Sequence, residues 1–155
     1  MAKEINNIEL VEEITKKLFE LLEMDVNLDV YEDSENEAIR VDIKSADEQG
    51  LLIGKRGETL FSLQSIISMI VRQRLGDWER IIVNVGDWRE KQEDYLGDLA
   101  KQAAQRAIDT GEEQFLYNLN PNQRRVVHTT LSEFDTVETE SRGEGIERFL
   151  VVRPK

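Results

Sequence analysis

The chain of 155 residues carries 32 acidic and 20 basic side chains, one histidine and no cysteine. A chain without cysteine excludes thiol catalysis, disulfide frameworks and iron–sulfur sites, and a single histidine excludes metal centres built from several imidazoles. No apolar run approaches the roughly 18 residues of a membrane span, and the polar N-terminus is unlike a secretory signal. We therefore expect a cytoplasmic protein with no membrane insertion and no cofactor.

The negative charge is concentrated in the first third of the chain. Residues 1–50 hold 15 acidic and 5 basic side chains, whereas residues 51–155 hold 17 and 15, so the net charges are −10 and −2. An acidic protein is an unusual partner for nucleic acid, but the second segment is compatible with a weakly basic patch that binds phosphate with modest affinity.

Hydrophobic spacing predicts two small α+β domains. Within the first, Ser45 and Glu48 match a capping box, which predicts a short helix up to about Ile53. The predicted elements of this domain (residues 1–86) are a helix at 8–22, strands at 26–30 and 39–43, helices at 45–53 and 60–74, and a strand at 81–85. Those of the second (residues 87–155) are a helix at 87–110, a strand at 114–118, a helix at 120–134, and strands at 136–141 and 148–153.

A four-residue turn, Gly54, Lys55, Arg56 and Gly57, joins two predicted helices and is called here the Gly54–Gly57 turn. Glycine has no Cβ, so the backbone of such a turn can approach a ligand closely. The amides that open the second helix carry the positive end of its dipole, and two cations lie beside them. Phosphate binding and plain turn geometry both explain this pattern.

A nucleotide-binding P-loop is a competing interpretation of Gly50, Gly54 and Lys55, and it fails on spacing. The P-loop requires four residues between its glycines and a Ser or Thr after the lysine, where this chain has three residues and Arg56. We therefore exclude ATP or GTP hydrolysis at this turn.

The order helix, strand, strand, helix, Gly-x-x-Gly, helix, strand resembles the prokaryotic type of K-homology (KH) domain. The resemblance implies that the Gly54–Gly57 turn clamps the backbone of about four nucleotides. It also implies an adjoining apolar groove for the bases, lined by Ile53, the first turns of the following helix and the strand at 39–43.

In the second domain Arg124 and His128 are four residues apart on a predicted helix, so both project from one face, with Arg125 beside them. Asn120 and Pro121 predict the start of this helix. A lone histidine is commonly a structural hydrogen-bonding group. A catalytic alternative pairs His128 with Glu133 or Asp135 for RNA cleavage.

The Arg-x-x-x-His spacing, with the later Ser141 to Gly145 segment and Arg153-Pro154, resembles the R-three-H domain. That resemblance implies contact of Arg124 and His128 with single-stranded nucleic acid, and we add Arg125, Arg142 and Arg148 as further candidates. Arg142 and Arg148 have an alternative role, which is ion pairing with the acids Glu133, Asp135, Glu138 and Glu140.

The two domains in succession resemble the Jag family, also called SpoIIIJ-associated or KhpB-like proteins. This resemblance implies non-catalytic RNA binding, a small single-KH partner protein, and post-transcriptional control linked to cell elongation, division or envelope synthesis in Gram-positive bacteria. Many members carry an additional N-terminal Jag-N domain, whereas this sequence begins at the predicted KH helix; truncation and a lineage without that domain both explain this start. An acidic adaptor that acts by protein contact is the alternative. The sequence leaves open RNA versus single-stranded DNA, and monomer versus homo- or heterodimer.

Overall fold

A computed structural model describes residues 6–155, which divide into two compact units; the first ends at Arg89, and the second is Glu90–Lys155. The division falls at the start of a long helix, slightly beyond the predicted boundary between residues 86 and 87. No helix among the described residues combines the length and apolar character needed to cross a membrane.

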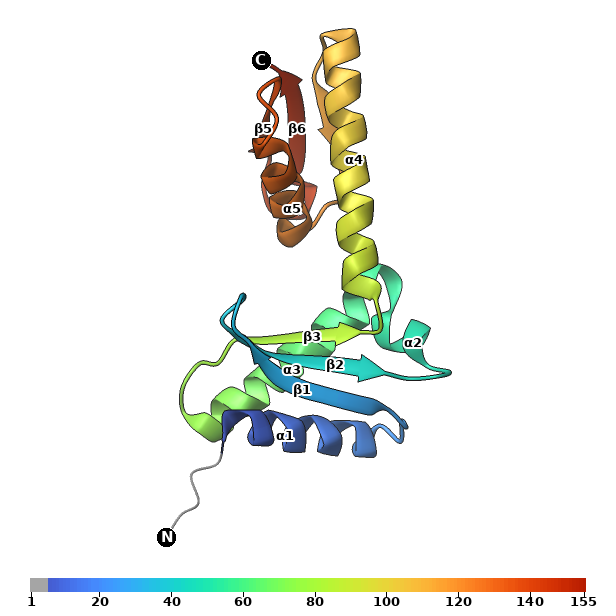
Figure 1. The fold of residues 1–155 in the computed structure, drawn as a ribbon, viewed down its shortest axis with the longest axis vertical. Helices are drawn as coiled ribbons and strands as arrows, with labels where there is room; N and C mark the ends of the chain where they lie inside the picture. The colour runs from blue at the N-terminus through green and yellow to red at the C-terminus, as the bar shows by residue number, and fades with distance from the viewer. Residues whose placement is uncertain (1–5) are drawn as a thin grey trace. The chain divides into compact units, whose positions relative to one another are not determined.

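The first unit has the predicted element order of a KH domain. Its three strands lie in the order β1-β2-β3, with β1 antiparallel and β3 parallel to β2 (Figure 1). Parallel neighbours need a crossover connection, which the two helices around the Gly54–Gly57 turn provide. The elements are α1 (Asn7–Leu21), β1 (Asn27–Asp33), β2 (Ala38–Lys44), α2 (Gln49–Ile53), α3 (Glu58–Leu75) and β3 (Ile81–Val85).

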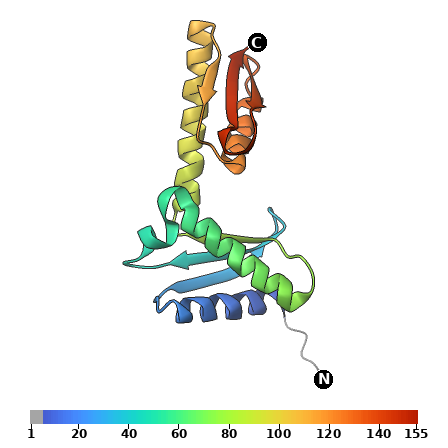
Figure 2. The same ribbon diagram turned by 180° about the vertical axis from the view of Figure 1, so that it is seen from behind.

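Helices α1 and α3 cover one face of this sheet, as the view from behind shows (Figure 2). Apolar residues three or four apart give each helix one buried stripe, and alternate residues of β2 and β3 meet these stripes. The fully buried core includes Val11 and Phe19 of α1, Leu60, Ile67 and Val71 of α3, Val41 and Ile43 of β2, and Val83 and Val85 of β3.

The start of α2 differs from the prediction. The Ser45 hydroxyl accepts a hydrogen bond from the Glu48 amide at 3.2 Å, as a capping box requires, but the helix begins only at Gln49. Glu48 occupies the N-cap position without a side-chain cap. Half of the box therefore forms a turn before the helix, and the predicted start at residue 45 was wrong.

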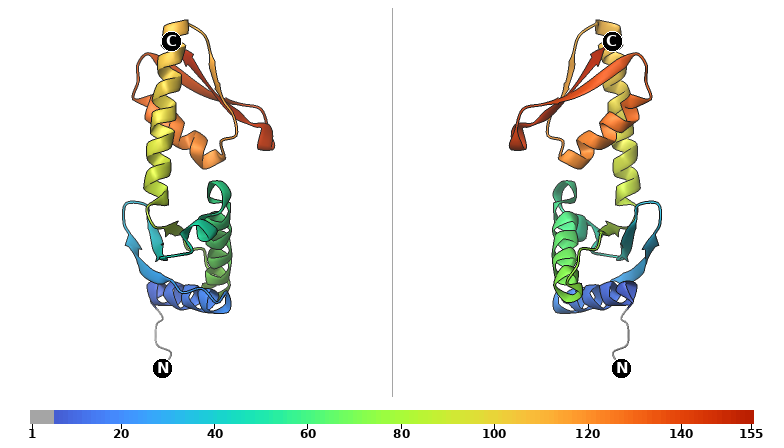
Figure 3. Two further views of the ribbon diagram at one scale, coloured as in Figure 1. Left: turned by 90° about the vertical axis from the view of Figure 1, so that its right-hand side faces the viewer. Right: turned by 90° about the vertical axis from the view of Figure 1, so that its left-hand side faces the viewer.

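The second unit also follows the predicted order. Its strands are all antiparallel in the order β4-β6-β5, and α4 and α5 pack against one face of the sheet (Figure 3). A capping box opens α5, because Asn120 and Gln123 exchange hydrogen bonds of 2.9 Å between side chain and backbone. The elements are α4 (Trp88–Thr110), β4 (Gln114–Leu116), α5 (Pro121–Ser132), β5 (Val137–Arg142) and β6 (Phe149–Pro154).

Alanines give this core its close packing. Ala100, Ala103, Ala104 and Ala107 of α4 are buried against larger side chains of the other elements. Small residues on one helix face let the sheet and the second helix approach closely. The larger partners are Val127 and Leu131 of α5, Val137 of β5, and Leu150 and Val152 of β6.

Candidate nucleic-acid interface

The Gly54–Gly57 turn has an unusual backbone. The φ angles are 69° at Gly54, 55° at Arg56 and 80° at Gly57, all in the region that L-residues rarely adopt. The ψ of −171° at Gly54 completes a conformation that is essentially restricted to glycine. The first glycine is thus required by the path of the chain, whatever the turn binds.

Both glycines are also required by their neighbours. A Cβ on Gly54 would lie 3.0 Å from the Thr59 amide nitrogen and 2.2 Å from its hydroxyl oxygen, and one on Gly57 would lie 2.5 Å from the Trp88 ring. Trp88 is fixed in turn by an edge-to-face contact with Phe61, with ring centroids 5.7 Å apart. The first unit therefore holds the turn from both sides.

The two cations of the turn point outward. Lys55 and Arg56 are exposed, and Glu58 is the sole acid between residues 49 and 76. Gly57 is the N-cap of α3 and supplies no side-chain oxygen to the amides of the first helical turn. This 18-residue helix thus offers amide donors and its positive dipole end next to two cations, an arrangement suited to a phosphate group.

The predicted groove beside the turn needs a correction. Ile39, Val41 and Ile43 of β2 are 4%, 0% and 0% exposed because their side chains fill the core beneath α1 and α3. Ile53 is partly buried and packs against the same core. Leu51, which the sequence did not single out, is 68% exposed and is the open apolar side chain near the turn.

Arg124 and His128 both lie on α5, as predicted, but make different contacts. The half-buried Arg124 guanidinium donates from Nη1 to the carbonyls of Leu119 at 2.6 Å and Arg148 at 3.5 Å, which ties the β4–α5 loop to the start of β6. His128 is exposed, and its Nδ1 contacts the Thr139 hydroxyl of β5. Arg124 has a structural role here, while His128 and the neighbouring exposed Arg125 remain open to a ligand.

Arg142 is occupied by two acids. Its guanidinium lies 3.0 Å from the Glu113 carboxylate and 3.1 Å from that of Glu140. These hydrogen bonds raise the pKa of Arg142, and the bond from Arg142 lowers the pKa of Glu113 below its ordinary value. The ion-pairing alternative is confirmed for Arg142. Arg148 is exposed and makes no ion pair within residues 6–155.

Comparison with known protein families shows which family the chain belongs to. The family model for the KH domain of KhpA and KhpB matches residues 8–85, half of the chain. The chain belongs to the KhpA/KhpB KH-domain family. A second model, for the R-three-H domain, matches residues 95–154, so the Gly54–Gly57 turn and the pair Arg124 and His128 each lie within a matched domain.

The relatives of this KhpA/KhpB-family chain include proteins named RNA-binding protein KhpB. That of Clostridium symbiosum is 34% identical over 92% of this chain and 64% of its own length. Those of Bacillus subtilis and Lactiplantibacillus plantarum are 30% and 32% identical, over 72% and 68% of this chain and 54% and 33% of theirs. The chain thus spans between a third and two thirds of each of these relatives.

The names of the relatives and the contacts of His128 both bear on the catalytic alternative. The relatives are named as RNA-binding proteins and not as enzymes. His128 contacts a hydroxyl of Thr139, whereas the alternative required a carboxylate from Glu133 or Asp135.

Three aromatic residues, which the sequence did not single out, form an aromatic cluster, defined here as Phe115, Tyr117 and Phe149; the first two are exposed and Phe149 is partly buried. Ring centroids are 6.3 Å apart for Phe115 and Tyr117, 6.0 Å for Phe115 and Phe149, and 5.2 Å for Tyr117 and Phe149. Two signals in the sequence point to it: aromatic residues alternate with the core residue Leu116, and residues 114–132 contain neither Asp nor Glu.

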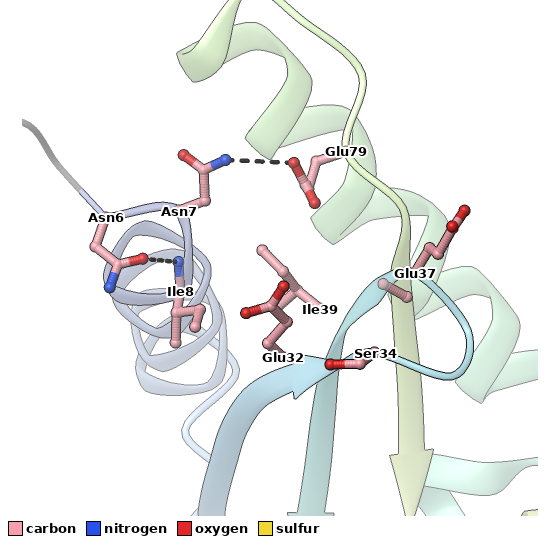
Figure 4. Close-up of a pocket in the computed structure, with 9 residues that line it drawn as sticks. Asn6, Asn7, Ile8, Glu32, Ser34, Glu37, Ile39 and Glu79 are labelled. Atoms are coloured by element: carbon pink, nitrogen blue, oxygen red, sulfur yellow. Dashed lines mark hydrogen bonds between the residues drawn. The ribbon is translucent and has the colours of Figure 1, made fainter.

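A hollow of about 480 Å³ in the first unit lies at the other end of β2 from the Gly54–Gly57 turn (Figure 4). Three carboxylates line it, and the Asn7 side chain donates to that of Glu79 at 3.3 Å. Negative charge of this density repels phosphate. The carboxylates belong to Glu32, Glu37 and Glu79. This acidic hollow is therefore less suited to a phosphate backbone than the Gly54–Gly57 turn is.

Proposed function

We propose that this chain is a non-catalytic single-stranded RNA-binding protein of the bacterial cytoplasm. The Gly54–Gly57 turn clamps the RNA backbone, and the second unit extends the contact. The observation that carries the proposal is the exposure of Lys55 and Arg56 beside the uncapped start of α3, in a segment almost free of acids. The names of the relatives, RNA-binding protein KhpB, support the same chemistry.

The second unit adds affinity through linkage. His128, Arg125 and Arg148 are exposed in the part matched by the R-three-H model. Once the turn holds one segment of RNA, a second weak site on the same chain binds at high effective concentration. Arg124 contributes by holding the backbone of this surface, and Arg142 contributes least because Glu113 and Glu140 neutralise it.

A double charge reversal at the turn tests the proposal. Lys55→Asp with Arg56→Asp should weaken binding to labelled single-stranded RNA by about 1–3 kcal/mol, measured by fluorescence anisotropy, with the fold intact because both side chains are exposed. The matched control is Lys16→Asp with Lys17→Asp on α1, where both side chains are 64% exposed. Equal affinity of the two double variants would refute the turn as a phosphate site. Matched DNA tests the preference for RNA.

A small single-KH protein is the partner that we propose for the first unit. Its support is an apolar patch on the outer side of α3, where Ile66, Met69 and Ile70 are 43%, 67% and 37% exposed at helical spacing. Through RNA and this partner, the protein would act in post-transcriptional control linked to cell elongation, division or envelope synthesis. Met69→Glu should prevent co-purification of such a partner and leave RNA binding by the turn unchanged.

The adaptor function remains the second candidate, because residues 1–50 carry a net charge of −10. An acidic surface attracts basic protein surfaces and repels nucleic acid. Under this alternative, the turn double variant would retain the full cellular effect of the wild type. Under RNA binding it would lose that effect.

A further inference from the structure

The aromatic cluster lies on the face of the second sheet that points away from its helices. Along β6, Leu150 and Val152 enter the core with α4 and α5, so Phe149 and Val151 point to the opposite face. Phe115 pairs with Val151 across the strands and therefore shares that face. The helices cover the other side.

Two of the three rings, Phe115 and Tyr117, are open to solvent, while Phe149 is partly buried beside the buried Val151. Phe115 is 46% exposed and Tyr117 is 59% exposed, while the core on the helix side takes Leu116 from between them. Their planes are inclined by only 20°. Exposed, clustered rings on a sheet face have no stabilising role comparable to burial, and every nucleobase has a π-face that stacks on such rings.

The chain that follows Tyr117 carries cations and no acids, whereas Glu147 accompanies Arg148 before Phe149. Arg124 donates to the carbonyls of Leu119 and Arg148, which lie two residues after Tyr117 and directly before Phe149. The Arg148 side chain is exposed, and no acid occurs from residue 114 to residue 132. Phosphates attached to a stacked base would thus find the exposed guanidinium of Arg148 and the acid-free stretch after Tyr117 at this border.

The carboxylates that do share this sheet face are neutralised. Arg142, which pairs with Phe149 across the strands, holds Glu113 and Glu140 in hydrogen-bonded ion pairs. Arg153 lies 2.7 Å from Glu138 and 3.5 Å from Glu140 in the same way. The face therefore presents rings and paired charges, which lowers the repulsion that free carboxylates would exert on an approaching strand.

We propose that the aromatic cluster is a base-stacking site for single-stranded nucleic acid, on which bases lie against Phe115, Tyr117 and Phe149 while the adjoining phosphates face Arg148. The site deepens the proposed RNA-binding function and rests on it. Stacking is tolerant of base identity, so this unit adds affinity without strong sequence preference. A protein partner fits the face less well, because the border presents the exposed guanidinium of Arg148, which is suited to phosphate.

The test replaces rings without removing charge. Phe115→Leu with Tyr117→Leu should weaken binding of single-stranded RNA by about 5- to 140-fold per stacked base, the factor that corresponds to base–aromatic stacking. The slope of affinity against salt should stay unchanged, because no phosphate contact is lost. Tyr95→Leu on α4, where the ring is 60% exposed, is the matched control and should bind as the wild type does.

Abasic oligonucleotides provide a second measurement, whose first arm uses the wild-type protein alone. In a series of RNAs, a pair of abasic sites is placed at successive positions. The wild type should lose affinity mainly when the pair lies at one position, and the affinity of the double Leu variant should not change when the pair lies there. Wild-type affinity in the double Leu variant, or an equal abasic penalty in both proteins at every position, would overturn the stacking site and reassign the face to protein contact. A wild type that binds no RNA would instead overturn the proposed function itself.

Discussion

The two surfaces assigned to RNA differ in what each exposes. At the Gly54–Gly57 turn the backbone is constrained and the cations Lys55 and Arg56 are exposed. On the second unit, Arg124 and Arg142 are used within the fold, and rings are exposed instead. The difference suggests that the first surface binds through phosphate charge and the second mainly through bases, so salt and base removal should affect them separately.

The largest expected effect concerns the constrained backbone. Gly54→Ala should lower the free energy of unfolding by about 2–4 kcal/mol, because alanine is strained in this conformation and its Cβ would overlap Thr59. Gly50→Ala in α2 is the control: its Cβ would meet nothing within 4 Å, and stability should rise by about 0.5–1 kcal/mol. Urea unfolding measures both, and equal midpoints would show that the turn is not constrained.

A comparison of salt dependence sharpens the contrast. Lys55→Gln with Arg56→Gln should reduce the slope of log affinity against log salt by about 1.4, since each phosphate contact of a single strand contributes about 0.7. The Phe115→Leu and Tyr117→Leu variant should keep the wild-type slope. Anisotropy titrations at several salt concentrations measure this, and a reduced slope in the ring variant would remove the distinction between the surfaces.

Neighbouring arginines on α5 test the division between structural and binding cations. Arg124→Ala should lower the free energy of unfolding by about 1–3 kcal/mol because it leaves the Leu119 carbonyl without its donor. Arg125→Ala, on the exposed neighbour, should change stability by less than about 0.5 kcal/mol and act on RNA affinity alone. If Arg125→Ala lowered the free energy of unfolding more than Arg124→Ala, the structural role would belong to Arg125 and not to Arg124.

The smallest effect concerns the ion pair of Arg142. The hydrogen bond from Arg142 lowers the pKa of Glu113 in the folded state. The pair therefore stabilises the fold at pH values above the pKa of Glu113 in the unfolded chain, and this stabilisation is lost as the pH falls through the pKa of Glu113 in the folded chain. Glu113→Gln should therefore be slightly less stable than wild type at neutral pH and equal to it in acid. Glu112→Gln is the control in thermal unfolding. A difference for Glu113→Gln that persists in acid would contradict the assignment.

Local patterns predicted the elements well. The strand Ile81–Val85 has its predicted bounds, and α4 ends at Thr110 as predicted, because apolar spacing and a following glycine act over short distances. The Asn120 cap and Pro121 placed α5 within a residue at its start. The Gly54–Gly57 turn was found in the same way, since its residues are contiguous.

Long-range contacts were not predictable from such patterns. Glu113, which binds Arg142, lies 29 residues away and was absent from the acids expected to pair with it. The strand at 39–43 was expected to line a groove, but burial by two helices depends on how they pack. Phe149 joins Phe115 only through strand pairing, so the aromatic cluster emerges from the fold.

The most direct test of the central claim is ultraviolet crosslinking of one single-stranded RNA to the wild-type protein, with the crosslinked peptides identified by mass spectrometry. Two units that share a strand should both yield crosslinks: around the Gly54–Gly57 turn and Leu51 in the first unit, and at Phe115, Tyr117 or Phe149 in the second. Crosslinks confined to other surfaces, or none from an RNA that saturates the protein, would contradict a two-surface RNA-binding protein.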